Sequence, residues 1–185
     1  MVLLIEITKA YHFTALKHVN QRRKGVAAEP YINHLTEVAE LVAVATRGND
    51  IDLVMAAVLH DTIEDTATTV EELAAAFGLR VAELVAEVTD DKSLPKLERK
   101  RLQIEHAALA SPRAKMIKIA DKVSNLRALG SSPPAGWSRA RIEECMAWAI
   151  QVVAGCRGVN FWLESEFDNA AKLVCRGGPS LRDRS

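Results

Sequence analysis

The chain contains one almost uninterrupted apolar run, Ile51–Leu59, which leads directly into the charged hexapeptide His60-Asp61-Thr62-Ile63-Glu64-Asp65. An apolar run of this kind needs burial on all sides, so any fold must place it, and the ionisable residues that follow it, close to the core. We therefore expect one buried helix over about residues 51–63.

The four ionisable residues of this hexapeptide lie on one side of such a helix, because Glu64 is four residues from His60 and Asp65 is four from Asp61. Three carboxylates there repel one another, and the helix dipole disfavours each at a C-terminus by about 0.3–1 kcal/mol. A bound divalent cation would reverse both effects. The segment therefore predicts a metal site.

Helical periodicity dominates the rest of the chain, aromatic residues are few, and no segment shows a convincing period-two alternation. We expect an all-α fold of about ten short helices in a single domain, residues 1–175, followed by a disordered tail, 176–185. The helices are expected over about residues 8–21, 30–48, 51–63, 69–78, 81–88, 96–110, 113–129, 138–154 and 159–174.

Composition argues against nucleic-acid and membrane partners. Lys plus Arg and Asp plus Glu number 24 each, so the whole chain has no electrostatic attraction for an anionic polymer or surface. The basic clusters Arg22-Arg23-Lys24 and Lys96–Arg101 lack interleaved aromatic residues, which argues against nucleic-acid binding. No stretch approaches the roughly 20 apolar residues that a membrane span needs.

The cysteines indicate a cytoplasmic protein. Cys145, Cys156 and Cys175 are odd in number and show no C-x-x-C spacing, which favours free thiols over disulfides or a zinc site. The apolar start, Val2 to Ile5, is too short for a signal peptide. Oligomeric state is left open, a homo-oligomer included.

Two further polar residues fit the predicted metal site. His34 lies on the apolar face of its expected helix, where a lone histidine is commonly a hydrogen-bonded core residue. Asp121 shares a helix face with Asn125, and taken alone it reads as a surface ion-pair partner. Combined with His60 and Asp61, however, they supply two imidazoles and two carboxylates, a coherent ligand set for a borderline divalent ion.

The order His, His-Asp, Asp, with the last acid some sixty residues after the pair, is the pattern of the HD superfamily. The chain resembles the hydrolase domain of the RelA/SpoT stringent-response enzymes, and in particular the small stand-alone alarmone hydrolases of the Mesh type. The motifs that carry the resemblance are Arg22–Lys24, Pro30–His34, Leu59–Thr66, Val88–Lys92, Leu94–Arg101, Ala120–Lys122 and Gly136–Ser138.

The resemblance implies an HD-domain helical fold and a role for each matching residue. The metal ligands correspond to His34, His60, Asp61 and Asp121. The residues that orient and activate water or support the site correspond to Glu64, Asp65 and Asn125. The substrate contacts correspond to Arg23, Lys24, Lys96 and Arg141.

The resemblance also implies the reaction: a manganese-dependent enzyme, with one ion per chain, that hydrolyses guanosine tetra- or pentaphosphate to GDP or GTP plus pyrophosphate. No synthetase segment is present, so we expect degradation of the alarmone without synthesis. The chain departs from the family at Gly25, where many relatives carry an acidic residue or serine, and at Ser124, where an aromatic residue or histidine is common.

Two alternatives remain open from the sequence. The protein could be an HD phosphohydrolase of another nucleotide, such as a nucleoside phosphate or the 2′-phosphate of NADPH, or it could be a non-catalytic nucleotide sensor. The remaining chemical groups are expected to be structural. Surface or packing roles are expected for His12, His18 and His106, and core positions for Trp137, Trp148 and Trp162.

Overall fold

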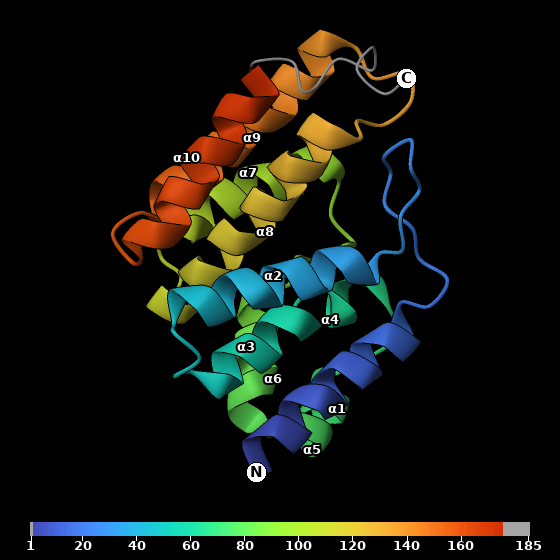
Figure 1. Cartoon of the computed structure of the whole chain (residues 1–185), viewed down its shortest axis with the longest axis vertical. Helices are drawn as coiled ribbons and strands as arrows, with labels where there is room; N and C mark the ends of the chain where they lie inside the picture. Colours follow the sequence, from blue (N-terminus) through green and yellow to red (C-terminus); the bar gives the residue numbers. More distant parts are fainter. Residues whose placement is uncertain (1, 176–185) are drawn as a thin grey trace.

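The computed structural model describes residues 2–175, and over this range the chain forms ten α-helices and no strand, as expected for an all-α fold (Figure 1). The expected tail, 176–185, lies outside the described residues. The helices are α1 (Val2–Lys17), α2 (Ile32–Ala45), α3 (Ile51–Leu59), α4 (Thr62–Asp65), α5 (Val70–Phe77), α6 (Leu79–Val88), α7 (Lys96–Ala107), α8 (Pro112–Ser131), α9 (Arg139–Cys156) and α10 (Phe161–Cys175).

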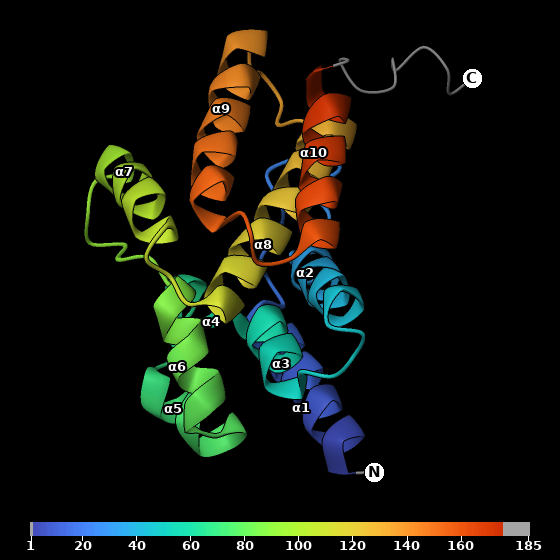
Figure 2. The ribbon, with the colours of Figure 1, turned by 90° about the vertical axis from the view of Figure 1, so that its left-hand side faces the viewer.

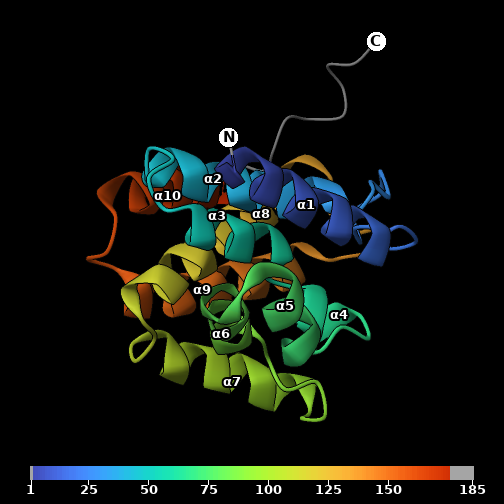
Figure 3. The same cartoon turned by 90° about the horizontal axis from the view of Figure 1, so that it is seen from below.

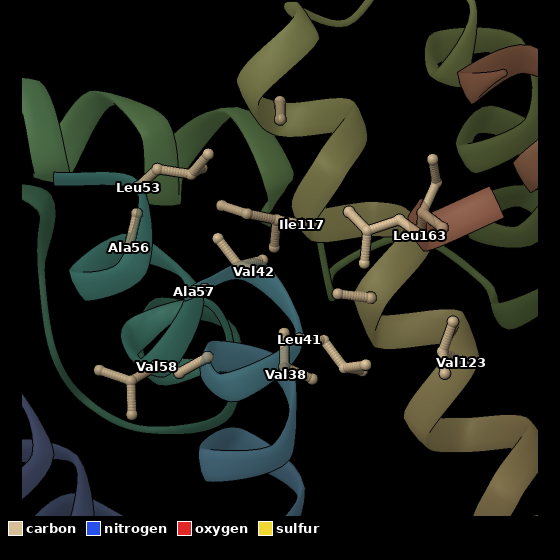
Figure 4. Packing of buried hydrophobic residues seen from close by; sticks show 14 of the residues in the cluster. Val38, Leu41, Val42, Leu53, Ala56, Ala57, Val58, Ile117, Val123 and Leu163 are labelled. Carbon is tan, nitrogen blue, oxygen red and sulfur yellow. The ribbon is translucent and has the colours of Figure 1, made fainter. Parts of the chain in front are cut away.

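Helix α3 forms the centre of the core, as its sequence predicts. All seven residues from Leu53 to Leu59 are buried, and α3 packs against α1, α2, α6 and α8. Figure 4 shows Ala56 and Ala57 of α3 beside Val42 of α2. Small and branched side chains pack closely at this crossing, so the C-terminal end of α3 is held firmly against α2.

The long helix α8 connects two groups of helices. It packs against α2 and α6 on one side and against α9 and α10 on the other, and α7 packs on α9 (Figure 2). Viewed from below, α6 packs against α3 on the side away from α2, and α5 packs against α6 (Figure 3). Among the described residues, no helix has both the length and the apolar character that crossing a membrane requires.

The expected single helix over residues 51–63 is interrupted, and that prediction was wrong. Helix α3 ends at Leu59, Asp61 has φ −95° and ψ 0°, and the short helix α4 starts at Thr62. The break turns the side chains of His60 and Asp61 toward α2 and α8, whereas Glu64 and Asp65 stay on α4. The hexapeptide therefore contributes side chains to two places in the fold, His60 and Asp61 beside α2 and α8, and Glu64 and Asp65 on α4.

The segment before α2 also differs from the expectation. Helix α1 begins at Val2 and ends at Lys17, so it lies several residues earlier than predicted. Pro30 does not start a helix, because it forms an isolated antiparallel β-bridge with Arg22. The loop between residues 21 and 31 is closed by backbone hydrogen bonds, among them Tyr31 N–H to Gln21 O at 3.0 Å.

This loop packs tightly against the loop that follows α8. An ideal Cβ on Gly25 would lie 2.2 Å from the backbone oxygen of Ser132, which no side chain can tolerate. The backbone N–H of Ala27 donates to Ser132 Oγ at 3.1 Å. Glycine at position 25 therefore permits the contact that places the basic residues of the loop beside α8.

Candidate metal centre and adjoining groove

Four predicted ligands from three parts of the chain converge in one place: His34 on α2, His60 and Asp61 between α3 and α4, and Asp121 on α8. His34 Nε2 lies 3.3 Å from Asp121 Oδ1 and 3.7 Å from Asp61 Oδ2. His60 Nε2 lies 3.2 Å from Asp61 Oδ2 and 3.9 Å from Asp121 Oδ1. Two ligand atoms at about 2.1 Å from one octahedral ion are roughly 3.0 Å apart when adjacent and roughly 4.2 Å apart when opposite, so separations between these limits suit a single cation.

The orientation of His60 leaves one nitrogen without a hydrogen-bond partner. Its Nδ1 lies 2.8 Å from the carbonyl oxygen of Ala57, which only accepts, so Nδ1 carries the hydrogen. In the neutral ring Nε2 then carries a lone pair, and this atom is buried without a hydrogen-bond partner. Burial opposes a charge on His60, but Asp61 and Asp121 raise its pKa to about 9. The position next to Nε2 therefore favours a positive charge.

His34 is oriented by a second set of hydrogen bonds. Ser124 Oγ donates to Glu37 Oε2 at 2.6 Å and lies 2.8 Å from His34 Nδ1, so it accepts the hydrogen of that nitrogen. Burial lowers the pKa of His34, and the neutral ring presents the lone pair of Nε2 to the two carboxylates. Fixing the tautomer through the outer nitrogen is the usual support of a metal-binding imidazole.

The two carboxylates are held by residues from the groove side. Asp61 Oδ2 accepts from the Tyr31 hydroxyl at 2.6 Å. Asp121 accepts from Lys122 Nζ at 2.7 Å and from Asn125 Nδ2 at 2.6 Å. Burial alone would raise the carboxyl pKa values, but His60 lowers the pKa of Asp61 and Lys122 lowers that of Asp121.

The chemistry of this donor set fits a divalent cation. Two carboxylates that stay ionised lie 3.2–3.9 Å from the Nε2 atoms of His34 and His60. The raised pKa of His60 means that, without a metal, its Nε2 takes up a proton among them, and a divalent cation would take the place of that proton. One ligand atom each from His34, His60 and Asp121 lie within 4.8 Å of one another.

A groove of about 590 Å³ adjoins this cluster. Tyr31, Lys122 and Asn125, which hold the two carboxylates, also line the groove, so the cluster lies directly behind its wall. Seven further lining residues are basic, against three acidic ones, Glu64, Asp65 and Asp90. The basic ones are Arg22, Arg23, Lys24, Lys92, Lys96, Arg99 and Lys100.

Glu64 and Asp65 project from α4 into this groove. Glu64 Oε2 accepts from the backbone N–H of Asp90 at 3.3 Å, and its Oε1 lies 3.7 Å from Arg99. Asp65 accepts from Lys92 on one oxygen and from Gln21 Nε2 at 2.7 Å on the other. Burial, with the charges of Asp61 and Asp90, raises the pKa of Glu64 to about 7.

This pKa makes a prediction for the metal-free protein. The folded state binds the Glu64 proton more tightly than the unfolded chain, so the resulting stability is present below the ordinary pKa of 4.5 and is lost as pH rises through about 7. Glu64→Gln is therefore expected to raise the free energy of unfolding by about 1–3 kcal/mol at pH 8, with little change at pH 4. Urea denaturation with a chelator measures this. An equal change at both pH values would contradict it.

The predicted substrate residues take different places around the groove. Arg23 lines it and donates to Asn125 Oδ1 at 3.1 Å, while Lys24 and Lys96 line it with exposed side chains. Arg141 does not line the groove. Its guanidinium lies 4.3 Å from the centre of the Trp137 ring, and Trp137 does line the groove. The structure thus brings three of the four into the groove and the fourth to its edge.

The expectation that the tryptophans belong to the core was wrong for Trp137 and Trp162 and holds in part for Trp148, which packs against the core and also lines the groove. Trp137 and Trp148 are half-buried and line the groove, and Trp162 is 38% exposed. Lys122 Nζ lies 4.4 Å and Lys100 Nζ 4.7 Å from the Trp148 ring. Cation–π contacts of this kind allow the indole to face a polar groove.

Sequence reasoning missed several residues of the site. Tyr31 and Lys122 lie inside motifs that were already singled out, beside His34 and Asp121, so their position in those motifs was an available signal. Glu37, which holds Ser124, lies one helical turn after His34. The roles found for His12, His18 and His106 agree with the expected surface or packing roles, since His12 and His106 are exposed and His18 is buried against Tyr31. The hydrogen bond of His18 to Gln21 was not expected.

Comparison with known proteins agrees with this arrangement. A family model for the HD domain matches residues 10–149. The human guanosine-3′,5′-bis(diphosphate) 3′-pyrophosphohydrolase MESH1 is 49% identical over 167 residues, which are 90% of this chain and 93% of the human protein. The protein of the same name from Drosophila melanogaster is 48% identical over 156 residues, which are 84% of this chain and 87% of the Drosophila protein.

The fold is shared as well. A solved structure described as "A metazoan ortholog of SpoT hydrolyzes ppGpp and plays a role in starvation responses" matches with a TM-score of 0.87 at 45% identity, covering 93% of this chain and 96% of that one. Family model, relatives and fold all agree along most of the chain. The chain therefore belongs to the HD domain family, in the branch that contains the MESH1 proteins.

Proposed function

We propose that this protein is a metal-dependent hydrolase that removes the 3′-diphosphate of guanosine tetra- or pentaphosphate, giving GDP or GTP and pyrophosphate. One observation carries the proposal: a cation-type cluster of two imidazoles and two carboxylates lies behind a basic groove into which Glu64 projects. Relatives about half identical in sequence are named for this reaction. All of residues 1–175 would form this one domain.

His34, His60, Asp61 and Asp121 would hold one divalent ion per chain. Manganese is the proposed ion, because it is a hard-to-borderline cation that accepts mixed imidazole and carboxylate ligands. When bound, the ion supplies Lewis acidity and a more acidic water. His60 would bind the ion through the lone pair of Nε2, because its Nδ1–H donates a hydrogen bond to Ala57 O.

Glu64 acts as the general base in this mechanism. Its pKa of about 7 suits proton transfer near neutral pH, where a base is ionised yet still basic enough to accept a proton. The water oxygen bonds to the phosphorus attached to the ribose 3′-oxygen, and Glu64 takes the water proton. The bond between that phosphorus and the 3′-oxygen breaks, and the 3′-oxygen leaves as a hydroxyl with the proton that Glu64 took from the water, which returns Glu64 to its ionised form. Asp65 and Asn125 orient the reacting groups.

The groove supplies charge for a polyphosphate. Arg23, Lys24 and Lys96 are placed to bind phosphate oxygens, and a guanidinium such as that of Arg23 also stacks on a purine. Arg141 and Trp137 stack at the edge of the groove, and a nucleotide base could stack on them in turn. The proposed partner is thus a small nucleotide.

A cytoplasmic location is part of the proposal. The three thiols, Cys145, Cys156 and Cys175, are free, which is usual for proteins of a reducing compartment. A soluble nucleotide substrate would be met there.

The direct test is pyrophosphate release from guanosine tetraphosphate. After treatment with a chelator the protein is expected to release none, and added manganese is expected to restore release. GTP and NADPH serve as comparison substrates. Inert guanosine tetraphosphate with rapid phosphate release from NADPH would favour the other phosphohydrolase, and tight nucleotide binding without any turnover would favour the sensor.

The hydrogen bonds behind His34 make a second prediction. Ser124→Ala removes the acceptor of the Nδ1 hydrogen, so the ring loses its fixed orientation, while Glu37 keeps its ion pair with Arg127 and the fold is retained. Manganese affinity is expected to fall about 10- to 100-fold in calorimetric titration. Ser131→Ala, an exposed serine on the same helix, is the matched control. Equal affinity in both variants would remove Ser124 from the mechanism.

A further inference from the structure

Behind Asp65 lies a pair of polar side chains to which the mechanism above gives no task. Gln21 Nε2 donates to Asp65 Oδ2 at 2.7 Å, and Gln21 Oε1 lies 2.6 Å from His18 Nδ1. His18 is only 2% exposed. Both residues come from the segment that follows α1, so the contact joins that segment to α4, 44 residues further along the chain.

The chemistry of the three groups fixes the direction of these hydrogen bonds. A carboxylate only accepts, so the amide NH₂ of Gln21 faces Asp65 and its oxygen faces His18. His18 Nδ1 must therefore carry a hydrogen, and the neutral ring has its lone pair on Nε2. The three side chains form one directed chain that ends on Asp65.

Packing alone does not explain an imidazole at this position. His18 Nε2 is buried without a hydrogen-bond partner, a cost that an aromatic hydrocarbon side chain would avoid. The ring stacks on Tyr31, with centroids 5.6 Å apart and planes at 24°, and Tyr31 in turn holds Asp61. His18 thus lies behind two acids of the site, Asp65 through Gln21 and Asp61 through Tyr31.

Asp65 needs such a restraint. It is the last residue of the four-residue helix α4, and its other hydrogen-bond partner, Lys92, has a side chain that is 46% exposed. An exposed lysine holds a carboxylate loosely, because its long side chain keeps most of its freedom. The contact from Gln21 comes instead from a residue that is itself held by a buried ring.

We propose that His18 and Gln21 are positioning residues, which hold Asp65 in the orientation that aligns the attacking water. This rests on the proposed function, since it assigns them a part in that reaction. Gln21 lines the groove and acts through Asp65, whereas His18 does not line it and acts through Gln21.

The test begins with His18→Phe, which keeps a ring against Tyr31 and removes the Nδ1 hydrogen. The kcat is expected to fall about 10- to 100-fold, with KM and manganese affinity within about twofold of the wild type. His18→Asn places an amide NH₂ near the former Nδ1 and is expected to recover most of the loss. His12→Phe, at an exposed histidine of α1, is the matched control and is expected to leave kcat unchanged.

A double-mutant cycle with Asp65→Ala, which removes the acceptor of the Gln21 hydrogen bond, separates positioning from structural support. Measured by single turnover, the effect of His18→Phe is expected to shrink to less than about twofold when Asp65 is already replaced, because the two changes then remove the same interaction. An equal fall in both backgrounds, or an unchanged kcat in His18→Phe, would overturn the proposal. If His18→Phe does not fold, Gln21→Leu takes its place in the cycle.

A spectroscopic measurement makes the inference independent of turnover. In ¹⁵N-histidine NMR spectra, His18 is expected as the Nδ1–H tautomer, and Gln21→Leu is expected to change its signals. An Nε2–H tautomer in the wild type would overturn the proposal. Failure of the wild type on guanosine tetraphosphate counts against the proposed function only, and the kinetic cycle is then run with the nucleotide that the protein does hydrolyse.

Discussion

His60→Ala is expected to abolish detectable manganese binding at micromolar protein and to lower kcat by at least about 10³-fold, which corresponds to some 4 kcal/mol. The buried Nε2 of His60 lies within 3.9 Å of both carboxylates and has no hydrogen-bond partner. Removal of the ring takes away one of the four proposed ligands, so the ion loses one of its donors.

Calorimetric titration with manganese and steady-state turnover measure this effect. His106→Ala is the matched control, because that histidine is exposed on α7, and it is expected to match the wild type in both assays. Thermal unfolding adds a check on the fold: manganese is expected to raise the Tm of the wild type and of His106→Ala, but not that of His60→Ala. Retained turnover in His60→Ala would rule out the ligand role.

Glu64→Gln is expected to lower kcat by about 10²–10⁴-fold while manganese affinity stays close to that of the wild type. The amide is nearly the same size and its oxygen still accepts from the Asp90 N–H, so the side chain keeps its place. What it loses is the ability to take a proton from water. Retained manganese affinity with a lower kcat therefore distinguishes the proposed base, Glu64, from the four proposed metal ligands.

The pH dependence distinguishes a base from a group that only binds. In the wild type, kcat/KM is expected to rise with pH through the pKa of Glu64, which is about 7 without metal and lower with a cation nearby. In Glu64→Gln this rise is expected to disappear. Glu83→Gln, at an exposed position of α6, controls for the loss of one carboxylate. A similar pH profile in Glu64→Gln would assign the proton transfer to another group.

The parts of the fold that depend on local pattern were predictable. The all-α class, most helix ends and the burial of Leu53–Leu59 follow from periodicity. The break after Leu59 was not predictable in this way. His60 and Asp61 are turned by contacts with Tyr31 and Asp121, which lie far away in the sequence.

The misassigned aromatic residues have a related cause. A helical pattern shows that the half-buried ring of Trp148 turns inward, but it does not tell a packed core from a groove wall. That distinction depends on Lys122, which comes from α8 and reaches the ring of a residue on α9. The link from His18 to Asp65 could not be predicted, because the two residues are 47 positions apart and are connected only through Gln21.

The contact between Gly25 and Ser132 limits how this protein can change by substitution. A side chain at position 25 requires the backbone near residue 132 to move, so the two positions should covary among close relatives rather than drift separately. Loop grafting faces the same limit. Exchanging residues 21–31 for a loop with a larger residue at position 25 will require the segment after α8 to be transplanted with it.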